Sequence, residues 1–182
     1  MIVIVTGSKL WKDKNVVWNT LEEVYEEALQ QQEKIPKKYS KHFPFDIGFE
    51  MFNGECEQGA DLFATQWYEY VSKLEYKVSY RPFPARWNMC SDMCPPDFVQ
   101  RKYKFKHIRY GQFGPYCPTA GMKRNREMVE TAVIETPKHY VPGICLAFCL
   151  DDSPGTLNCG RLAKRRGFEL RPHRMGRSTK RM

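Results

Sequence analysis

The chain lacks any long hydrophobic run. Its opening segment, Ile2 to Val5, is apolar and β-branched, but it is far shorter than the roughly 20 residues of a membrane span. It is also too short for a signal-peptide core, and no basic region precedes it. We therefore expect a cytoplasmic protein with no membrane partner.

The cysteines form neither a disulfide framework nor a common metal motif. There are seven, an odd number, scattered along the chain, which is typical of a reducing compartment. Cys90, Cys94, His107 and Cys117 match no common zinc spacing. We therefore expect no metal and no other cofactor. Ser/His/Asp arrangements and suitably spaced carboxylate pairs are also missing; Asp151-Asp152 is as compatible with a turn as with an acid pair.

The body of the chain has no excess charge of either sign. The net charge is +8, but nine Lys/Arg residues lie from Arg161 onward against one acid, Glu169, so this end carries all of it. A basic end can hold phosphate or nucleic acid, or it can be a solvated terminus. We favour a solvated basic tail for 175–182. Both alternatives stay open for Arg161, Lys164 and Arg165.

The chain does contain alternating apolar runs and helical patterns. Apolar runs predict strands at 2–5, 47–52, 76–83, 144–150 and 168–171. Helical periodicity predicts helices from residue 13 to a polar loop at 30–44, and at 62–71, 121–133 and 157–166. This order predicts an α/β, Rossmann-like three-layer fold: a central parallel sheet of about five strands with helices on both faces. We expect one domain, residues 1–174, with an irregular insertion at 88–118.

Small and polar residues follow three of the predicted strands, where ligands bind in such sheets. Glycine permits close backbone approach there, and a helix start attracts anions. The three corners contain Thr6, Gly7 and Ser8; Gly54, Gly59 and Asp61; and Ser153, Gly155 and Thr156. A capping turn is the alternative for the first corner, and a helix cap is the alternative for Asp61. Ser153-Pro154 fits a helix N-cap with proline at the first helical position, which leaves Gly155 to be explained by an anion. None of the corners has the Walker A or dinucleotide-binding spacing.

A cationic cluster opens the predicted helix at 121–133. If Met128 and Val129 face the core, Arg124 and Asn125 lie near the same end of the sheet as the three corners. The helix dipole does not favour an arginine at this position. A phosphate partner would account for it, because the guanidinium binds phosphate in bidentate geometry. A solvated helix face is the alternative.

Five segments follow one another in an order that resembles the YspA-type branch of the SLOG superfamily, Rossmann-like proteins of bacteria and their phages. The segments are Val3 to Ser8 with Trp11; Asn53 to Asp61 with Ala64 and Trp67; Arg81 to Trp87; Gly121 to Met128; and Ser153 to Thr156. The resemblance implies nucleotide-derived ligands and a homodimer or larger oligomer, in the host cytoplasm if a phage encodes the protein. The superfamily includes Lonely Guy phosphoribohydrolases and DprA-like DNA-binding proteins.

The resemblance leaves catalysis open. In the phosphoribohydrolases, an Arg-Lys-x-x-Met segment and a Pro-Gly-Gly-x-Gly-Thr-x-x-Glu segment carry the reaction. Arg124 and Met128 match the first segment, and Gly155-Thr156 match the second, but the glutamate position falls on Cys159. Phosphate binding is therefore implied without that catalytic acid, and Arg124 and Asp61 remain the catalytic candidates.

We predict a protein that binds a nucleotide or nucleotide-derived ligand, as a sensor or a processing protein. Gly155 and Thr156 would hold the phosphate, Arg124 would neutralise it, and Asp61 would contact the sugar. Trp87 or an aromatic residue of the insertion would stack on the base. The floor would be shaped by Gly7, Ser8, Gly54 and Gly59. One alternative is an N-glycosidic hydrolase acting on nucleoside monophosphates. Another is a nucleic-acid-binding protein that uses the basic aromatic segment 101–107 and the tail.

Overall fold

The five longest strands form one parallel sheet. The computed structural model describes residues 1–34, 48–87, 89, 109–111, 114–138, 141–150 and 153–175. The strands are β1 (Ile2–Gly7), β2 (Phe49–Asn53), β3 (Val78–Pro82), β6 (Ile144–Leu150) and β7 (Glu169–Met175), in the order β3-β2-β1-β6-β7. A separate antiparallel pair joins β4 (Arg109–Gly111) to β5 (Gly114–Tyr116).

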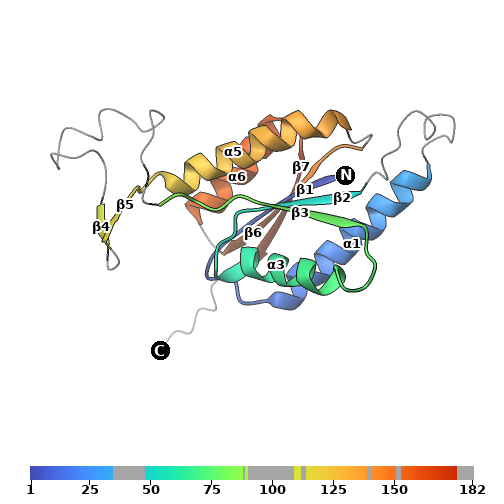
Figure 1. Ribbon diagram of the computed structural model, residues 1–182, viewed down its shortest axis with the longest axis horizontal. Coiled ribbons are helices and arrows are strands. Elements are labelled where there is room, and N and C mark those ends of the chain that lie inside the picture. Colours follow the sequence, from blue (N-terminus) through green and yellow to red (C-terminus); the bar gives the residue numbers. More distant parts are fainter. Residues whose placement is uncertain are drawn as a thin grey trace.

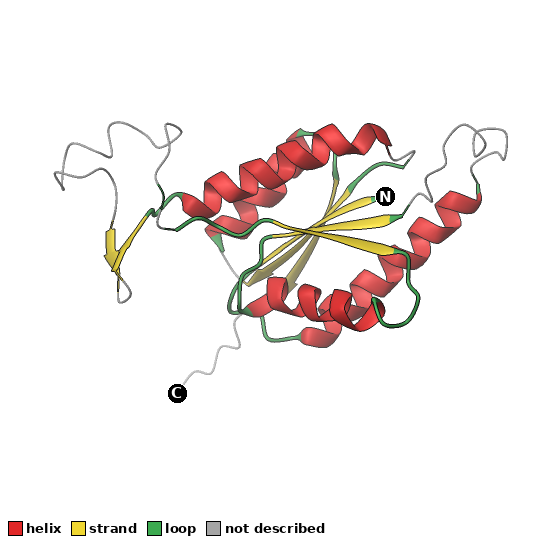
Figure 2. Cartoon of the chain, in the orientation of Figure 1, coloured by secondary structure: helices red, strands yellow, loops and turns green. Residues whose placement is uncertain are grey.

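Helices cover both faces of the sheet, two on each (Figures 1 and 2). They are α1 (Lys14–Glu33) and α3 (Gly59–Val71) on one face, and α5 (Ala120–Glu135) and α6 (Pro154–Arg165) on the other. A short 3-10 helix, η1 (Thr136–Lys138), follows α5. The predicted α/β, Rossmann-like three-layer fold with a five-stranded parallel sheet is confirmed.

Strand β1 shows why the apolar runs are continuous. Val3 and Val5 belong to the core under α1 and α3, whereas Ile2 and Ile4 belong to the core under α5 and α6. All four side chains are fully buried. A strand covered on both faces has no polar side, so its residues read as an uninterrupted hydrophobic segment.

Several predicted boundaries were wrong. Helix α1 continues to Glu33, past the predicted loop start at Gln30, and α6 begins at Pro154 rather than Leu157. Strand β7 extends to Met175, because it pairs with β6 along its whole length. The insertion at 88–118 is not wholly irregular, since it contains β4 and β5. Residues 35–44, 101–107 and 176–182, named in other predictions, lie outside the described residues.

The strand order places a reversal of direction next to β1. The chain proceeds outward from β1 to β2 and β3, and then returns to form β6 on the opposite side of β1. At such a switch point, the connections from neighbouring strands diverge and leave a crevice at the carboxyl ends. Helices α3, α5 and α6 begin at this edge, on the left in Figure 1. The three predicted corners therefore share one edge of the sheet.

The two edge strands carry proline and paired arginines. Pro82 lies in β3 and Pro172 in β7, as expected because proline lacks the N–H that a central strand needs. On β3, Arg81 pairs with Glu50 at 2.8 Å. On β7, Arg171 pairs with Glu27 of α1 and with Glu169, each at 2.7 Å.

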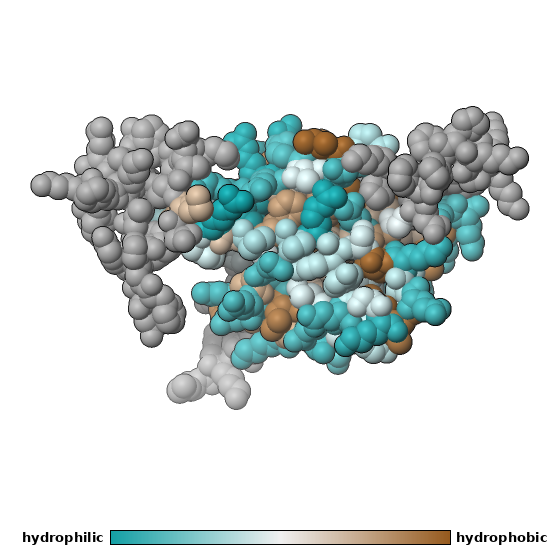
Figure 3. All heavy atoms as spheres, in the orientation of Figure 1, coloured by the Kyte–Doolittle hydropathy of each residue, from teal (hydrophilic) through white to brown (hydrophobic). Residues whose placement is uncertain are grey.

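The visible surface is mainly hydrophilic. Figure 3 shows separate hydrophobic spots among polar side chains rather than one continuous apolar face. Among the described residues, no helix combines the length and hydrophobicity needed to cross a membrane.

Candidate functional site

The first two corners are in direct contact, and glycine is required at both. Gly59 starts α3 with φ of 70°, and a Cβ there would lie 2.1 Å from the carbonyl oxygen of Ser8. A Cβ at Gly7 would lie 2.3 Å from that of Ala60. Only glycine allows the β1 loop and the start of α3 to approach this closely.

Asp61, in the first turn of α3, forms the acidic centre of the site. It is only 3% exposed, and its Oδ1 accepts a hydrogen bond of 3.1 Å from the backbone N–H of Gly7. Burial raises its pKa from 3.8 to about 6, partly opposed by Arg124 and by the N–H groups of Cys56 and Gly7. Asp61 therefore ties the two corners together and titrates near neutral pH.

Arg124 reaches this carboxylate from α5, across the crevice. Its Nη1 lies 3.6 Å from Asp61 Oδ2, and the two side chains are 15% and 4% exposed. Gly54 makes room for the pair, because a Cβ there would lie 1.3 Å from Arg124 Nη1 and 2.7 Å from Asp61 Oδ2. The predicted convergence of Arg124 with the Gly54–Asp61 corner is therefore observed.

The guanidinium of Arg124 is poorly satisfied where it lies. Its Nε and Nη1 are buried, and neither has a hydrogen-bond partner among the described residues. The contact with Asp61 is close enough for charge attraction but too long for a hydrogen bond. A buried donor without an acceptor carries a desolvation cost. This cation would gain free energy from an additional acceptor.

The third corner, at the start of α6, has free space around its glycine, whereas the glycines of the second corner are closely packed. Ser153 Oγ and Thr156 Oγ1 are 3.0 Å apart, and Thr156 is buried. Pro154 occupies the first turn of α6, as expected for a helix start. In contrast to Gly54 and Gly59, Gly155 has no described atom beyond its chain neighbours and its own helix backbone within 4 Å of the place where a Cβ would stand. The free protein therefore has no steric need for glycine at this position.

Asn125 joins α5 to this third corner. Its side-chain amide donates a 3.0 Å hydrogen bond to the carbonyl of Gly155, and its Oδ1 has no partner among the described residues. Adjacent residues of α5 therefore reach two corners: Arg124 meets Asp61 at the start of α3, and Asn125 meets Gly155 at the start of α6.

The remaining predicted residues lie at the margins. Trp87 is 51% exposed, and its ring lies 3.4 Å from where a Cβ of Gly121 would stand, one helical turn before Arg124. Thr6 is buried within β1, and Ser8 uses its hydroxyl to accept from the N–H of Leu10. Asp151 and Asp152 lie outside the described residues.

Sequence reasoning missed the role of Asn53 at the end of β2. This fully buried residue donates from its amide to the carbonyl of Asp61 at 3.0 Å, and its Oδ1 accepts from the N–H of Glu55 at 2.6 Å. Glu55 adopts φ of 50°. The Asn-Gly pair at 53–54 is a turn signal that identifies this position.

Cys159, at the position of the phosphoribohydrolase glutamate, faces the core. It is fully buried, in the same cluster as Cys145 and Ala163. A hydrogen bond between the two thiols, together with burial, raises the pKa of Cys145. Neither thiol is therefore available to a ligand at the crevice. Among the described residues, no group of three His, Cys, Asp or Glu side chains could hold a metal.

No protein-family model, curated protein or solved structure matches this chain. The resemblance to the SLOG superfamily therefore stays a prediction from the sequence.

Proposed function

We propose that this protein binds a nucleotide or nucleotide-derived ligand at the carboxyl ends of the parallel strands. The observation that carries the proposal is Arg124, a largely buried guanidinium beside a carboxylate, two of whose nitrogens have no hydrogen-bond partner among the described residues. A phosphate offers several acceptor oxygens in a geometry that matches the guanidinium fork. The negative charge of a phosphate would also exceed that of the Asp61 carboxylate. The Arg124 guanidinium would therefore be attracted more strongly to the phosphate than to Asp61.

Gly155 supports a phosphate position at the start of α6. The space around it is open, and glycine in the first turn weakens the helix. A ligand that approaches the backbone closely would account for this residue, because the N–H groups of a helix start bind anions. Asn125 supports the same position, since its free Oδ1 lies beside the corner.

In this proposal, Asp61 has two roles to distinguish. Its contacts with Gly7 and Arg124 make it the counter-ion that holds Arg124 in place before the ligand arrives. The sugar contact predicted for Asp61 requires one of its oxygens to become accessible when Arg124 moves toward the phosphate. The stacking role of Trp87 draws support from its exposure near the start of α5.

Calorimetry with a panel of nucleoside mono-, di- and triphosphates tests the proposal. Arg124→Ala should weaken binding about 10- to 100-fold, as expected for loss of a charge-assisted hydrogen bond. Arg126→Ala is the matched control, because it removes an exposed arginine from the same helix. It should leave nucleotide affinity unchanged.

Two results would reject the assignment: equal affinity of Arg124→Ala and the unmutated protein, or equal losses in both variants. Thermal unfolding of each variant shows whether it is folded. If Arg124→Ala is not, Arg124→Lys keeps the charge, removes the fork and allows the same comparison.

A second candidate function is cleavage of the N-glycosidic bond of a nucleoside monophosphate. The observation that favours it is the buried position of Asp61 beside Arg124 and the N–H of Gly7. Burial raises its pKa to about 6, in the range where a carboxyl group can act as an acid or a base. Chromatography of the calorimetry samples should then show free base, and none with Asp61→Asn. Binding without release of base would reject this second candidate and leave the binding proposal in place.

A further inference from the structure

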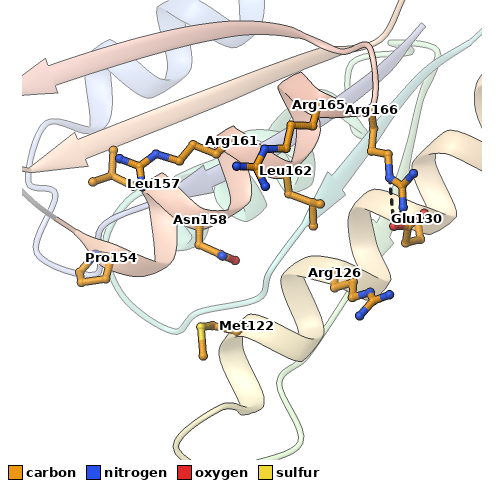
Figure 4. A pocket seen from close by; sticks show the side chains of 10 residues that line it. All are labelled: Met122, Arg126, Glu130, Pro154, Leu157, Asn158, Arg161, Leu162, Arg165 and Arg166. Carbon is orange, nitrogen blue, oxygen red and sulfur yellow. Dashed lines mark hydrogen bonds and ion pairs between the residues drawn. The ribbon is translucent and has the colours of Figure 1, made fainter. Parts of the chain in front are cut away.

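A second cationic region lies outside the crevice, in a groove between α5 and α6. The groove has a volume of about 680 Å³. Four arginines and a single acid line it, together with the apolar side chains of Met122, Leu157 and Leu162 (Figure 4); the charged residues are Arg126, Arg161, Arg165, Arg166 and Glu130. Three of these arginines belong to the basic end of the chain from Arg161 onward, which carries its net charge, and the fourth lies on α5.

Only one of the four arginines has its charge balanced. Arg166 bonds to Glu130 through its Nε at 3.1 Å. Arg126, Arg161 and Arg165 are exposed and have no acidic partner among the described residues. Arg161 and Arg165 stand one turn apart on α6, where like charges destabilise a helix. Within the part of the chain that the structure describes, three positive charges of the groove therefore have no acidic partner.

The arrangement fits a repeated anion better than a single one. Figure 4 shows Arg161 and Arg165 extending along α6 toward its N-terminal end, with Arg126 across the gap on α5. Positions one turn apart on a helix are separated by about 6 Å along its axis. Three cations distributed along a groove can neutralise successive charges, and arginine forms bidentate contacts with phosphate groups. The apolar side chains of Met122, Leu157 and Leu162 can contact the uncharged parts of a polymer that carries these anions.

We propose that this groove binds the sugar–phosphate backbone of a nucleic acid, without reading its sequence. The inference is independent of the nucleotide site, because it depends on neither Arg124 nor the α3 corner. It also differs from nucleic-acid binding by the basic tail, because its cations belong to α5 and α6. Charge complementarity along the groove points to a polyanion, and the phosphates of a nucleic acid are the anions that we assign to it.

Fluorescence anisotropy with labelled oligonucleotides tests the groove. The probes are single-stranded DNA, single-stranded RNA and duplex DNA of one sequence, each titrated across a range of salt concentrations. Three phosphate contacts on a single strand predict a slope of log affinity against log salt of about −2. The double variant Arg161→Gln/Arg165→Gln should reduce that slope by about 1.4 and weaken binding at low salt by at least about tenfold. The three probes show which form of nucleic acid binds best.

Two sets of variants make the result specific. Lys12→Gln/Lys73→Gln removes the same charge from exposed positions outside the groove and should retain affinity. Arg177→Gln/Lys180→Gln/Arg181→Gln removes charge from the tail and should have the smaller effect. Equal affinity of the groove variant and the unmutated protein would overturn the inference, as would loss of binding in the tail variant alone.

Two further measurements distinguish nucleic-acid binding in the groove from binding of an acidic protein and from nucleotide binding in the crevice. Poly-glutamate of the same net charge should bind much more weakly than the oligonucleotides; equal binding would indicate an acidic protein partner instead. The groove variant should keep its affinity for mononucleotides, whereas Arg124→Ala should lose it and keep oligonucleotide binding. The two sites can therefore fail separately.

Discussion

The α3 corner and the α6 corner begin helices at the same edge of the same sheet, yet one is closed and the other is open. At α3, glycines allow backbone and side chains to pack against Ser8 and Arg124. At α6, Gly155 faces open space. The comparison shows that glycine has two uses within one site: at α3 it serves the fold, whereas at α6 the fold does not require it.

The two arginines of α5 repeat this contrast. Arg124 and Arg126 are two residues apart, or about 200° around the helix. The first is 15% exposed and faces a carboxylate, and the second is exposed and lines the cationic groove. Identical side chains on one helix therefore take part in two different electrostatic environments, one buried and one in contact with solvent.

We expect the largest loss of stability from a substitution that disrupts the closely packed corner at the start of α3. Gly59→Ala introduces a Cβ 2.1 Å from a backbone oxygen, at a residue with φ of 70°, and neither the oxygen nor the dihedral angle can adjust cheaply. We expect a loss of about 4 kcal/mol in the free energy of unfolding, measured by denaturant titration. A loss below about 1 kcal/mol would show that this corner is not tightly packed.

A smaller effect comes from the titration of Asp61. Burial raises the pKa of Asp61 from 3.8 to about 6 in the folded protein, so the folded state binds this proton more tightly than the unfolded state. The resulting contribution to the free energy of unfolding is fully present below about pH 3.8 and is lost as the pH rises through about 6. The difference corresponds to about 3 kcal/mol. Asp61→Asn should remove this fall in stability.

Denaturant unfolding across the acid range measures the fall. Glu26→Gln, which changes an exposed carboxylate on α1, is the control and should retain it. If Asp61→Asn keeps the full pH dependence of the starting protein, another group is responsible and the burial argument for Asp61 is wrong.

We expect the smallest change in stability from a substitution at the open corner, at the start of α6. Gly155→Ala should leave the fold intact or stabilise it by up to about 1 kcal/mol, because alanine favours the first turn of α6 and meets no atom. The same methyl group should weaken nucleotide binding about tenfold if phosphate approaches the backbone here. Calorimetry and thermal unfolding of one sample measure both. Unchanged affinity would move the phosphate away from α6.

Most of the fold follows from apolar patterning. Strand β6 matches its predicted bounds, because all but its last residue are buried. Strand β7 was predicted too short, since its later residues alternate in burial and include Pro172 and charged side chains. Such an edge strand is defined by pairing with its neighbour, which an apolar run does not reveal. Pro154 begins α6, as the Ser153-Pro154 cap signal predicts, although the apolar pattern of the helix starts only at Leu157.

The site was predictable only in outline. The rule that ligands bind beyond the strand ends brought Arg124, Asp61 and Gly155 to one edge. The rule does not specify which atoms meet. The hydrogen bond from Asn125 to Gly155, the support of Asp61 by Asn53, and the core position of Cys159 each depend on helix rotation. Rotations of this kind are set by packing across the whole domain.

The two prolines of the edge strands have a consequence for self-association. An exposed, regular edge strand can form backbone hydrogen bonds with the edge strand of a second molecule. Such pairing leads to aggregation or to dimers that share a continuous sheet. Here Pro82 and Pro172 interrupt the row of donors on either side, and Arg81 and Arg171 add charge beside them. Edge-to-edge annealing is thereby discouraged at both ends of the sheet. If the protein forms the homodimer that the sequence resemblance predicts, we do not expect these two edge strands to pair across the interface.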